Sequence, residues 1–406
     1  MKKTYEYRAY PTVKQANKLG AWLEILRNLY NQALAWRKET YEQTGQSVKK
    51  STQEKALTPF RQESDTVASL HIDVLQDMID RLDKAYQAFF RRGKRGDKPG
   101  FPRFKGAGRY RSMTFRHLSN RLIRDIRKRT ARVVVPKIGD VKIHYHRPLP
   151  DGTIKTLTVR RKASGWYVCI VVEIADPVEI PVETTIGIDV GLASFLTTSD
   201  DDKVANPRHF RRSEKRLGKA QRILSRRDKG SVRYEKQREH VAKIHEHIGN
   251  QRRDFQGKTA HWLFCQCEEV AVEDLKIRNM VKNKHLSKSI SDAGWGNFRL
   301  RLQSKAANAG LTLTRVDPKH TSQKCSGCDS VVPKSLSERV HACPHCGLVL
   351  DRDYNAAINI KKAAVALRGG VSVVNDPETP CSGTEARNSI RPIGRTNKYR
   401  PLGRGN

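Results

Sequence analysis

The hydrophobic residues of the first hundred positions predict two long amphipathic helices. Within residues 12–36, apolar side chains recur every three or four positions, at Leu19, Trp22, Leu26, Leu29, Ala33 and Trp36. Thr12 and Gln15 have the spacing of a capping box, which favours a helix start there. A second stripe of the same period covers residues 71–92, at Leu75, Met78, Ile79, Leu82, Ala85, Tyr86 and Phe89. Both stripes are typical of helices that pack on a core.

Short alternating segments follow and predict a β-rich unit. Apolar and polar residues alternate in 131–136, 141–146, 154–161 and 166–174, with turn residues between them. Several short strands of this kind favour a small barrel or sandwich. Residues 4–10 alternate in the same way, so this N-terminal strand could belong to the same unit, with the helices inserted between.

Strands and helices mix beyond residue 181. Residues 184–199 predict a strand, a turn at Gly191 and a second strand, and 211–255 predict a strongly basic helical hairpin. Further strands are expected at 268–275 and 311–317.

Two more helices and a tail complete the pattern. A helix over 295–309 is expected to end at Gly310. A last helix starts near Asp353, with an apolar stripe at Ala357, Ile360, Ala364 and Leu367. Residues 369–406 combine Gly, Pro, Asn and Ser with scattered cations, and are predicted to form a disordered basic tail.

The net charge of the chain indicates which class of partner it binds. The 406 residues contain 78 Lys and Arg against 42 Asp and Glu, a formal charge of +36. The cations are spread along the chain, which favours a polyanion as partner, because each neutralised phosphate releases counterions. Charge that serves solubility alone is the weaker alternative, since self-repulsion destabilises a fold. A membrane surface is a further alternative, but no amphipathic anchor stands out.

The sequence gives no sign of export or membrane insertion. No segment approaches about 18 consecutive apolar residues, and the two lysines near the start are not followed by an apolar core. Eight cysteines, four of them in two C-x-x-C pairs, point to a reduced compartment and to metal ligation. We expect a cytoplasmic protein.

The two C-x-x-C pairs predict a zinc site. Cys325 and Cys328 are separated from Cys343 and Cys346 by residues 329–342, a spacing that can bring four thiolates around one tetrahedral ion. Because no ligand position is left open, this Zn²⁺ is expected to be structural. A redox dithiol pair is the alternative, but no thioredoxin-like strand precedes it.

Three acids in apolar surroundings are candidates for a second kind of metal site. Phosphodiester hydrolysis with two divalent ions needs converging carboxylates, and Mg²⁺ prefers such oxygen ligands. Asp189 lies in the apolar segment "IGIDVG", and Glu273 follows the apolar run "VAV". Taken singly, Asp189 could be a turn residue and Glu273 could cap the next element.

The segment "LVLDRDYNAAINI" offers two acids for the third position. Asp353 continues the apolar stripe of the last helix, so its carboxylate is expected to face whatever that helix packs on. Asp351 precedes the helix and could cap it or hold the return from the cysteine segment. The pattern favours Asp353, while N-capping remains the alternative for either residue.

A basic segment with aromatic residues predicts contact with nucleic acid. The basic and aromatic residues of the "KPGFPRFK" stretch are suited to bind phosphates and to stack on bases. By composition alone, a solvated linker is an equally good interpretation. The basic helical hairpin adds Arg226 and Arg227. The candidates in the stretch are Lys98, Phe101, Arg103, Phe104 and Lys105.

Eight motifs occur in a fixed order along the chain: "YRAYPTVKQ", "LRNLYNQAL", "KPGFPRFK", "IGIDVGLASF", "VEDLKIRNM", "SISDAGWGNFRLRLQSKA", "HTSQKCSGC" and "CPHCGLVLDRDYNAAINI". This ordered series resembles the transposon-encoded TnpB proteins, relatives of the type V CRISPR effector nucleases. It extends over most of the chain apart from the tail. Each motif is modest alone, but the ordered set is highly specific.

The resemblance implies an α+β multidomain fold. Residues 1–10 and 112–183 would form a wedge-like β-barrel domain, interrupted by a helical recognition domain at 11–111. Residues 184–320 and 351–368 would form a RuvC-like, RNase H-like α/β nuclease domain, into which a zinc ribbon at 321–350 is inserted. The tail at 369–406 would lie outside these domains.

The resemblance also implies an RNA-guided DNA endonuclease. Its catalytic acids would be Asp189, Glu273 and Asp353, holding two Mg²⁺ ions, and its partners would be a transposon-end-derived guide RNA and double-stranded target DNA. We expect a monomeric ribonucleoprotein without a membrane partner, in a prokaryotic cytoplasm and acting at the nucleoid. Gln76 falls in the region that would contact a short target-adjacent motif, and Arg299 matches a position near the active site.

Two other functions remain open from the sequence. An RNase H-like transposase would use the same acids for strand transfer, although the ribbon and the full motif series count against it. An RNA-guided regulator without cleavage would be expected to lack one or more acids, and all three are present.

Overall fold

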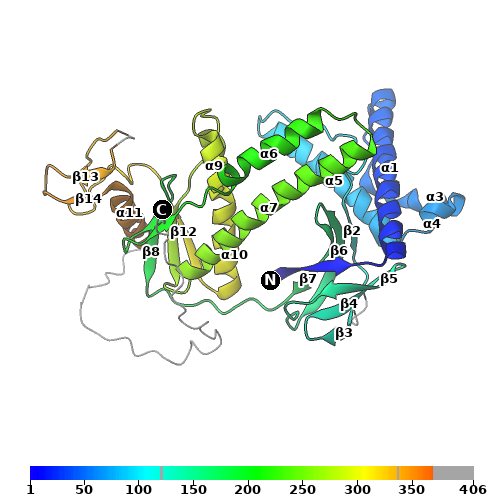
Figure 1. The fold of residues 1–406 in the computed structure, drawn as a ribbon, viewed down its shortest axis with the longest axis horizontal. Helices are drawn as coiled ribbons and strands as arrows, with labels where there is room; N and C mark the ends of the chain where they lie inside the picture. The colour runs from blue at the N-terminus through cyan, green and yellow to red at the C-terminus, as the bar shows by residue number, and fades with distance from the viewer. Residues whose placement is uncertain (119–121, 336–337, 369–406) are drawn as a thin grey trace.

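The computed structural model describes residues 1–118, 122–335 and 338–368, so the predicted tail lies outside the described residues. Figure 1 shows two sheets at opposite ends of the molecule, joined by long helices. The N-terminal sheet carries a group of helices on one side, and the second sheet carries a small hairpin beyond it. No helix in the described ranges is long and apolar enough to cross a membrane.

The first sheet has seven strands in the order β2-β6-β7-β1-β5-β4-β3, each antiparallel to its neighbours. The strands are β1 (Lys2–Tyr10), β2 (Ser112–Phe115), β3 (Ile123–Arg127), β4 (Thr130–Val135), β5 (Gly139–His144), β6 (Thr153–Lys162) and β7 (Gly165–Glu173). The sequence predicted β1, β4, β5, β6 and β7, where side chains such as Tyr7 and Ile170 are buried on one face. It did not predict β2 or β3 as strands. Since β1 lies between β7 and β5, the helices that follow it are an insertion into this sheet.

The insertion contains α1 (Val13–Thr44), α2 (Lys50–Lys55), α3 (Leu57–Glu63), α4 (Asp65–Ala68) and α5 (Ile72–Lys94). The predicted capping box is confirmed, because Thr12 accepts from the Gln15 amide and the Gln15 side chain accepts from the Thr12 amide. The two long helices pack through their predicted apolar stripes. The three short helices between them were not predicted, because each is too short for a periodic stripe.

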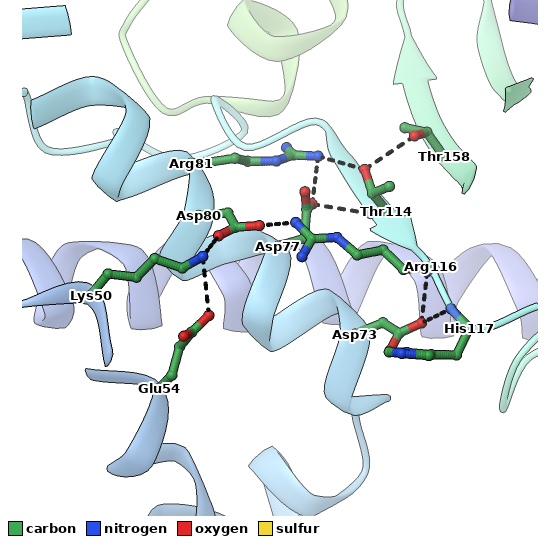
Figure 2. Close-up of polar contacts among 10 residues, drawn as sticks. All are labelled: Lys50, Glu54, Asp73, Asp77, Asp80, Arg81, Thr114, Arg116, His117 and Thr158. Carbon is green, nitrogen blue, oxygen red and sulfur yellow. Dashed lines mark hydrogen bonds and ion pairs between the residues drawn. The ribbon is translucent and has the colours of Figure 1, made fainter. Parts of the chain in front are cut away.

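The acidic face of α5 binds the edge strand β2 (Figure 2). Asp73 accepts hydrogen bonds from the backbone amides of Arg116 (2.7 Å) and His117 (2.8 Å), and Asp77 accepts from the amide of Thr114 (3.1 Å). Burial opposes ionisation of Asp73, but these bonds and the His117 ring lower the pKa of its carboxyl. The carboxylates thus satisfy donors that an edge strand would otherwise leave unpaired.

The second sheet has five strands in the order β10-β9-β8-β11-β12. They are β8 (Thr185–Asp189), β9 (Ser194–Thr198), β10 (Lys203–Ala205), β11 (Glu269–Glu273) and β12 (Thr312–Val316). The strands β8, β11 and β12 are parallel, while β9 is antiparallel to both of its neighbours. The strands β8 and β11 are almost wholly buried, which explains their near-continuous apolar sequences.

Helices and one hairpin surround this sheet. The helices are α6 (His209–Ser225), α7 (Val232–Leu263), α8 (Ile277–Met280), α9 (Ser287–Ala293), α10 (Trp295–Ala309) and α11 (Arg352–Leu367), and the hairpin pairs β13 (Val340–Ala342) with β14 (Val349–Asp351). The long helix α7 begins on the side of the first sheet and ends at the second (Figure 1). Near its middle, Glu246 accepts hydrogen bonds from the Ser164 amide (2.9 Å) and hydroxyl (2.5 Å) at the β6–β7 turn.

We predict that Asp73→Ala destabilises the joint between α5 and β2. The substitution leaves two backbone amides without their acceptor at a buried site, which should cost roughly 2–5 kcal/mol. The melting temperature of the purified protein should fall clearly, whereas Asp97→Ala, at an exposed position, should leave it unchanged. Equal melting temperatures for the two variants would show that the Asp73 bonds add nothing to stability.

Candidate active site and metal centre

The register of two parallel strands brings Asp189 and Glu273 together. Val272 lies opposite Ile188, so the next residue of each strand, Glu273 and Asp189, comes at the same sheet edge. Neighbouring strands are about 4.8 Å apart, and both acids end their strands. This is the carboxyl edge of the parallel strands, where ligands bind in open α/β sheets.

Close packing of α11 on β8 adds the third acid. A Cβ at Gly187 would overlap the carbonyl of Ala357 and would lie 2.6 Å from the amide nitrogen of Lys361, so only glycine permits this approach. Asp353 lies one helical turn before Ala357, and its Oδ2 is 3.8 Å from where a Cβ of Gly191 would stand. The carboxylate therefore lies over the β8–β9 turn, beside Asp189.

The three acids affect one another electrostatically. Burial, followed by the charges of Glu273 and Asp353, raises the pKa of Asp189 to about 8. Burial also raises the pKa of Glu273, although a hydrogen bond from the hydroxyl of Thr321 opposes this rise. Arg352 donates to Asp353 (3.1 Å) and is the nearest compensating cation. The site thus holds more negative charge than its protein cations neutralise.

Asp351 has the capping role that the sequence left open for it. Its Oδ1 accepts hydrogen bonds from the amides of Asp353 (2.8 Å) and Tyr354 (3.2 Å) at the start of α11. Its Oδ2 pairs with the Lys203 amine at 3.0 Å. The side chain of Asp351 is thereby held away from the sheet edge, whereas Asp353 faces it.

The four predicted cysteines form one cluster. The Sγ atoms of Cys325 and Cys346 are 3.6 Å apart, as are those of Cys328 and Cys343, and all four lie within 4.8 Å of one another. A tetrahedral zinc with Zn–S bonds of about 2.3 Å requires S···S distances of about 3.8 Å. The donors and their spacing therefore fit Zn²⁺. Within the described ranges no other group of three or more ligand residues is this tight, so the carboxylates are more widely spread.

Buried asparagines tie the cysteine segment to α11. Asn355 accepts from the amide of Ser326 (2.9 Å) and donates to the carbonyl of Lys324 (2.8 Å). Asn359, one turn later, donates to the carbonyls of Lys324 (2.6 Å) and Thr321 (2.9 Å). Sequence reasoning missed these residues, although Asp351, Asn355 and Asn359 recur at intervals of four and mark a polar face of the helix.

The predicted nucleic-acid contacts lie in separate places. Gln76 is half-buried on α5, and Arg226 and Arg227 lie at the end of α6 that leads into α7. Arg299, on α10, forms an ion pair with Asp274, the residue after Glu273. It therefore lies beside the sheet edge.

The basic aromatic stretch packs on the helical insertion. Lys98, Arg103 and Phe104 are exposed. Phe101 is also 44% exposed, but its ring contacts those of Tyr86 and Phe89. Asn31 of α1 bonds both the amide and the carbonyl of Lys105, whose amine lies 5.1 Å from the centroid of the Tyr30 ring. The stretch is thus anchored at Phe101 and Lys105, and is more than a solvated linker.

We predict that Cys343→Ser removes the metal from the cysteine cluster. One missing thiolate leaves an incomplete tetrahedron, so zinc measured by mass spectrometry should fall from one atom per chain toward zero. Cys265→Ser is the matched control, because Cys265 is exposed and outside the cluster. Equal zinc contents in the two variants would contradict the assignment.

Comparisons with known proteins agree with this architecture. Family models match residues 169–284 ("Probable transposase"), 295–360 ("Cas12f1-like, TNB domain") and 1–46 ("Helix-turn-helix domain"). The second match spans all four cysteines, Asp351 and Asp353. The third covers β1 and α1, which form a strand and one helix here.

Similar proteins and a solved structure cover nearly the whole chain. A Streptomyces pristinaespiralis protein named "Putative RNA-guided DNA endonuclease" is 34% identical, over 90% of this chain and 90% of that protein. The Escherichia coli K12 protein with the same designation, InsQ, is 27% identical over 89% and 92%. The cryo-EM structure of a Cas12f1-sgRNA-target DNA complex aligns with a TM-score of 0.53 and 14% identity, over 86% of this chain and 83% of that chain. The structural match supports the predicted α+β multidomain fold, and the sequence matches show that this chain belongs to the TnpB (IS605 OrfB) family of RNA-guided DNA endonucleases, related to Cas12f.

Proposed function

We propose that this chain is an RNA-guided DNA endonuclease whose active site is formed by Asp189, Glu273 and Asp353. The observation that carries this proposal is their convergence, from β8, β11 and α11, on one sheet edge. The five-strand order, in which β9 is antiparallel to both of its neighbours and β8, β11 and β12 are parallel, is that expected of a RuvC-like, RNase H-like nuclease domain. Residues 184–320 and 351–368 would make up this domain.

The three carboxylates are suited to hold two Mg²⁺ ions. Their oxygens are the ligands that Mg²⁺ prefers, and their charges are incompletely balanced by Arg352. Bound Mg²⁺ would supply a water activated for attack and charge neutralisation at the scissile phosphate. Asp189, whose pKa is about 8, would hold a proton at neutral pH without a cation and release it when one binds.

The remaining domains would bind the guide and the target. We assign 1–10 and 112–183 to a wedge-like β-barrel domain, 11–111 to a helical recognition domain and 321–350 to a structural zinc ribbon. Guide RNA and double-stranded DNA would contact the exposed cations of the 98–105 stretch and of the α6–α7 hairpin through phosphates and shape. Gln76, on α5, would lie where the protein reads a short target-adjacent motif.

We predict that Asp353→Asn abolishes cleavage while Asp351→Asn preserves it. Loss of one ligand charge at the sheet edge should slow DNA cleavage by roughly 100-fold or more. Asparagine at 351 can still cap α11, so that variant is the matched control two residues away. Target cleavage in Mg²⁺ with a cognate guide is the measurement, and binding of the guide RNA should be unchanged in both. Comparable cleavage by both variants would overturn the active-site assignment.

We predict that Asp189 makes the protein less stable as pH rises when Mg²⁺ is absent. Its pKa in the folded state, about 8, exceeds the ordinary value of 3.8, so the folded state binds the proton more tightly. Stability should therefore fall by up to about 1.4 kcal/mol per pH unit between these values. Asp189→Asn should remove this slope.

The measurement is the melting temperature across pH 5 to about 8, in buffer without Mg²⁺ and without a chelator that would strip the zinc. At the alkaline end, Asp189→Asn should have a higher melting temperature than the parent. Added Mg²⁺ should reduce this difference in melting temperature. Parallel curves for parent and variant would show that Asp189 is not buried beside like charges.

A further inference from the structure

The side chain of Glu273 is held by one hydroxyl. Among the described residues, Thr321 is the only hydrogen-bond donor to this carboxylate, and it contacts Oε1. Both side chains belong to residues that are 9% exposed, so water cannot readily replace the bond. A carboxylate that accepts one donor at Oε1 has its rotation fixed, and its second oxygen remains available to a cation.

Thr321 is itself held in place from α11. Its carbonyl accepts from Asn359 Nδ2 at 2.9 Å, and the same nitrogen donates to the Lys324 carbonyl at 2.6 Å. Its hydroxyl has a second acceptor within reach, the carbonyl of Pro318 at 3.3 Å. A hydroxyl carries a single proton, so the short contact with the charged Glu273 is the one that it should satisfy.

These contacts connect Glu273, on β11, with the helix that carries Asp353, which no strand pairing does. Asn359 and Asp353 lie on the same helix, and Asn359 fixes the backbone of Thr321, which orients Glu273. Thr321 also stands four residues before Cys325, at the base of the cysteine segment. A side-chain bridge through Thr321 thus links Glu273 to the helix that carries Asp353, in addition to the apolar packing of α11 on β11.

We propose that Thr321 is a positioning residue, whose hydroxyl orients Glu273 so that its free oxygen faces the cation at the sheet edge. This inference rests on the proposed function, because it assumes that Glu273 is a metal ligand. Thr321 touches neither substrate nor cation, and acts through Glu273. The "HTSQKC" motif therefore has a role at the active site in addition to leading into the zinc cysteines.

The test compares Thr321→Val with Thr321→Ser. Valine keeps the shape of threonine but cannot donate, whereas serine keeps the hydroxyl. We expect Thr321→Val to weaken Mn²⁺ binding roughly tenfold or more, measured by electron paramagnetic resonance on the guide-bound protein. The Mg²⁺ concentration for half-maximal cleavage should rise similarly, and Thr321→Ser should resemble the parent. Zinc content and guide binding should be unchanged in both.

Two results would overturn the role of Thr321. One is equal Mn²⁺ affinity in the valine and serine variants. The other is a further loss of affinity when Thr321→Val is added to Glu273→Gln, because the hydroxyl should matter only while Glu273 carries its carboxylate. If the valine variant does not fold, Thr321→Ala against Thr321→Ser gives the same comparison with a smaller side chain.

The proposed function can fail separately. If Asp189→Asn and Asp353→Asn cleave like the parent, the active-site assignment is wrong whatever Thr321 does. If these variants are inactive while Thr321→Val binds Mn²⁺ as Thr321→Ser does, only the positioning role is wrong.

Discussion

The burial of three acidic side chains beside one another is the constraint on which the half of this molecule around the second sheet depends. Asp189 and Glu273 are adjacent because β8 and β11 are paired in register, and Asp353 is brought beside them by α11. Folding must keep these acidic groups together at a buried edge where Arg352 is the nearest cation, and burial raises the pKa of Asp189 and of Glu273. The surrounding contacts are therefore best understood as devices that prevent the acids from moving apart.

Close backbone packing is the first of these devices. Gly187 lets α11 approach β8 so closely that the helix cannot shift along the strand without a steric clash. Fixing the rest of the helix takes specific polar contacts. At its start, Asp351 caps the backbone and pairs with Lys203, and at its end Arg368 contacts the fully buried Glu269. The helix is thus fixed at its start, middle and end.

The sequence predicted the elements well, but not the contacts that orient them. Stripes and alternation located α1, α5, the main strands and α11, because burial of one face leaves a clear period. The spacing of the cysteines predicted their cluster, because the tetrahedral geometry of a bound metal restricts how far apart its ligands lie in the sequence. The sequence offered helix capping as one role for Asp351, and its hydrogen bonds to the amides of Asp353 and Tyr354 confirm that role.

What the sequence could not supply were contacts between distant segments. Gly187 carried no signal, because its need for glycine comes from a helix some 170 residues later in the chain. Asn355, Asn359 and Thr321 were missed because an isolated polar residue in a helix or loop is usually solvated, and only tertiary structure shows that these are buried. Phe101 was predicted to contact nucleic acid, and the sequence did not show that its ring also packs on Tyr86 and Phe89.

The cysteine cluster follows from the same constraint through chain entropy. The segment between β12 and α11 must close a long loop, and a flexible loop of that length would leave α11 weakly tethered. Four thiolates around one zinc would fold the segment locally, so that its base presents the carbonyls of Thr321 and Lys324 at fixed positions to Asn355 and Asn359. On this argument a zinc bound by the four cysteines would stabilise the placement of Asp353 and Glu273, although it would lie outside the proposed active site.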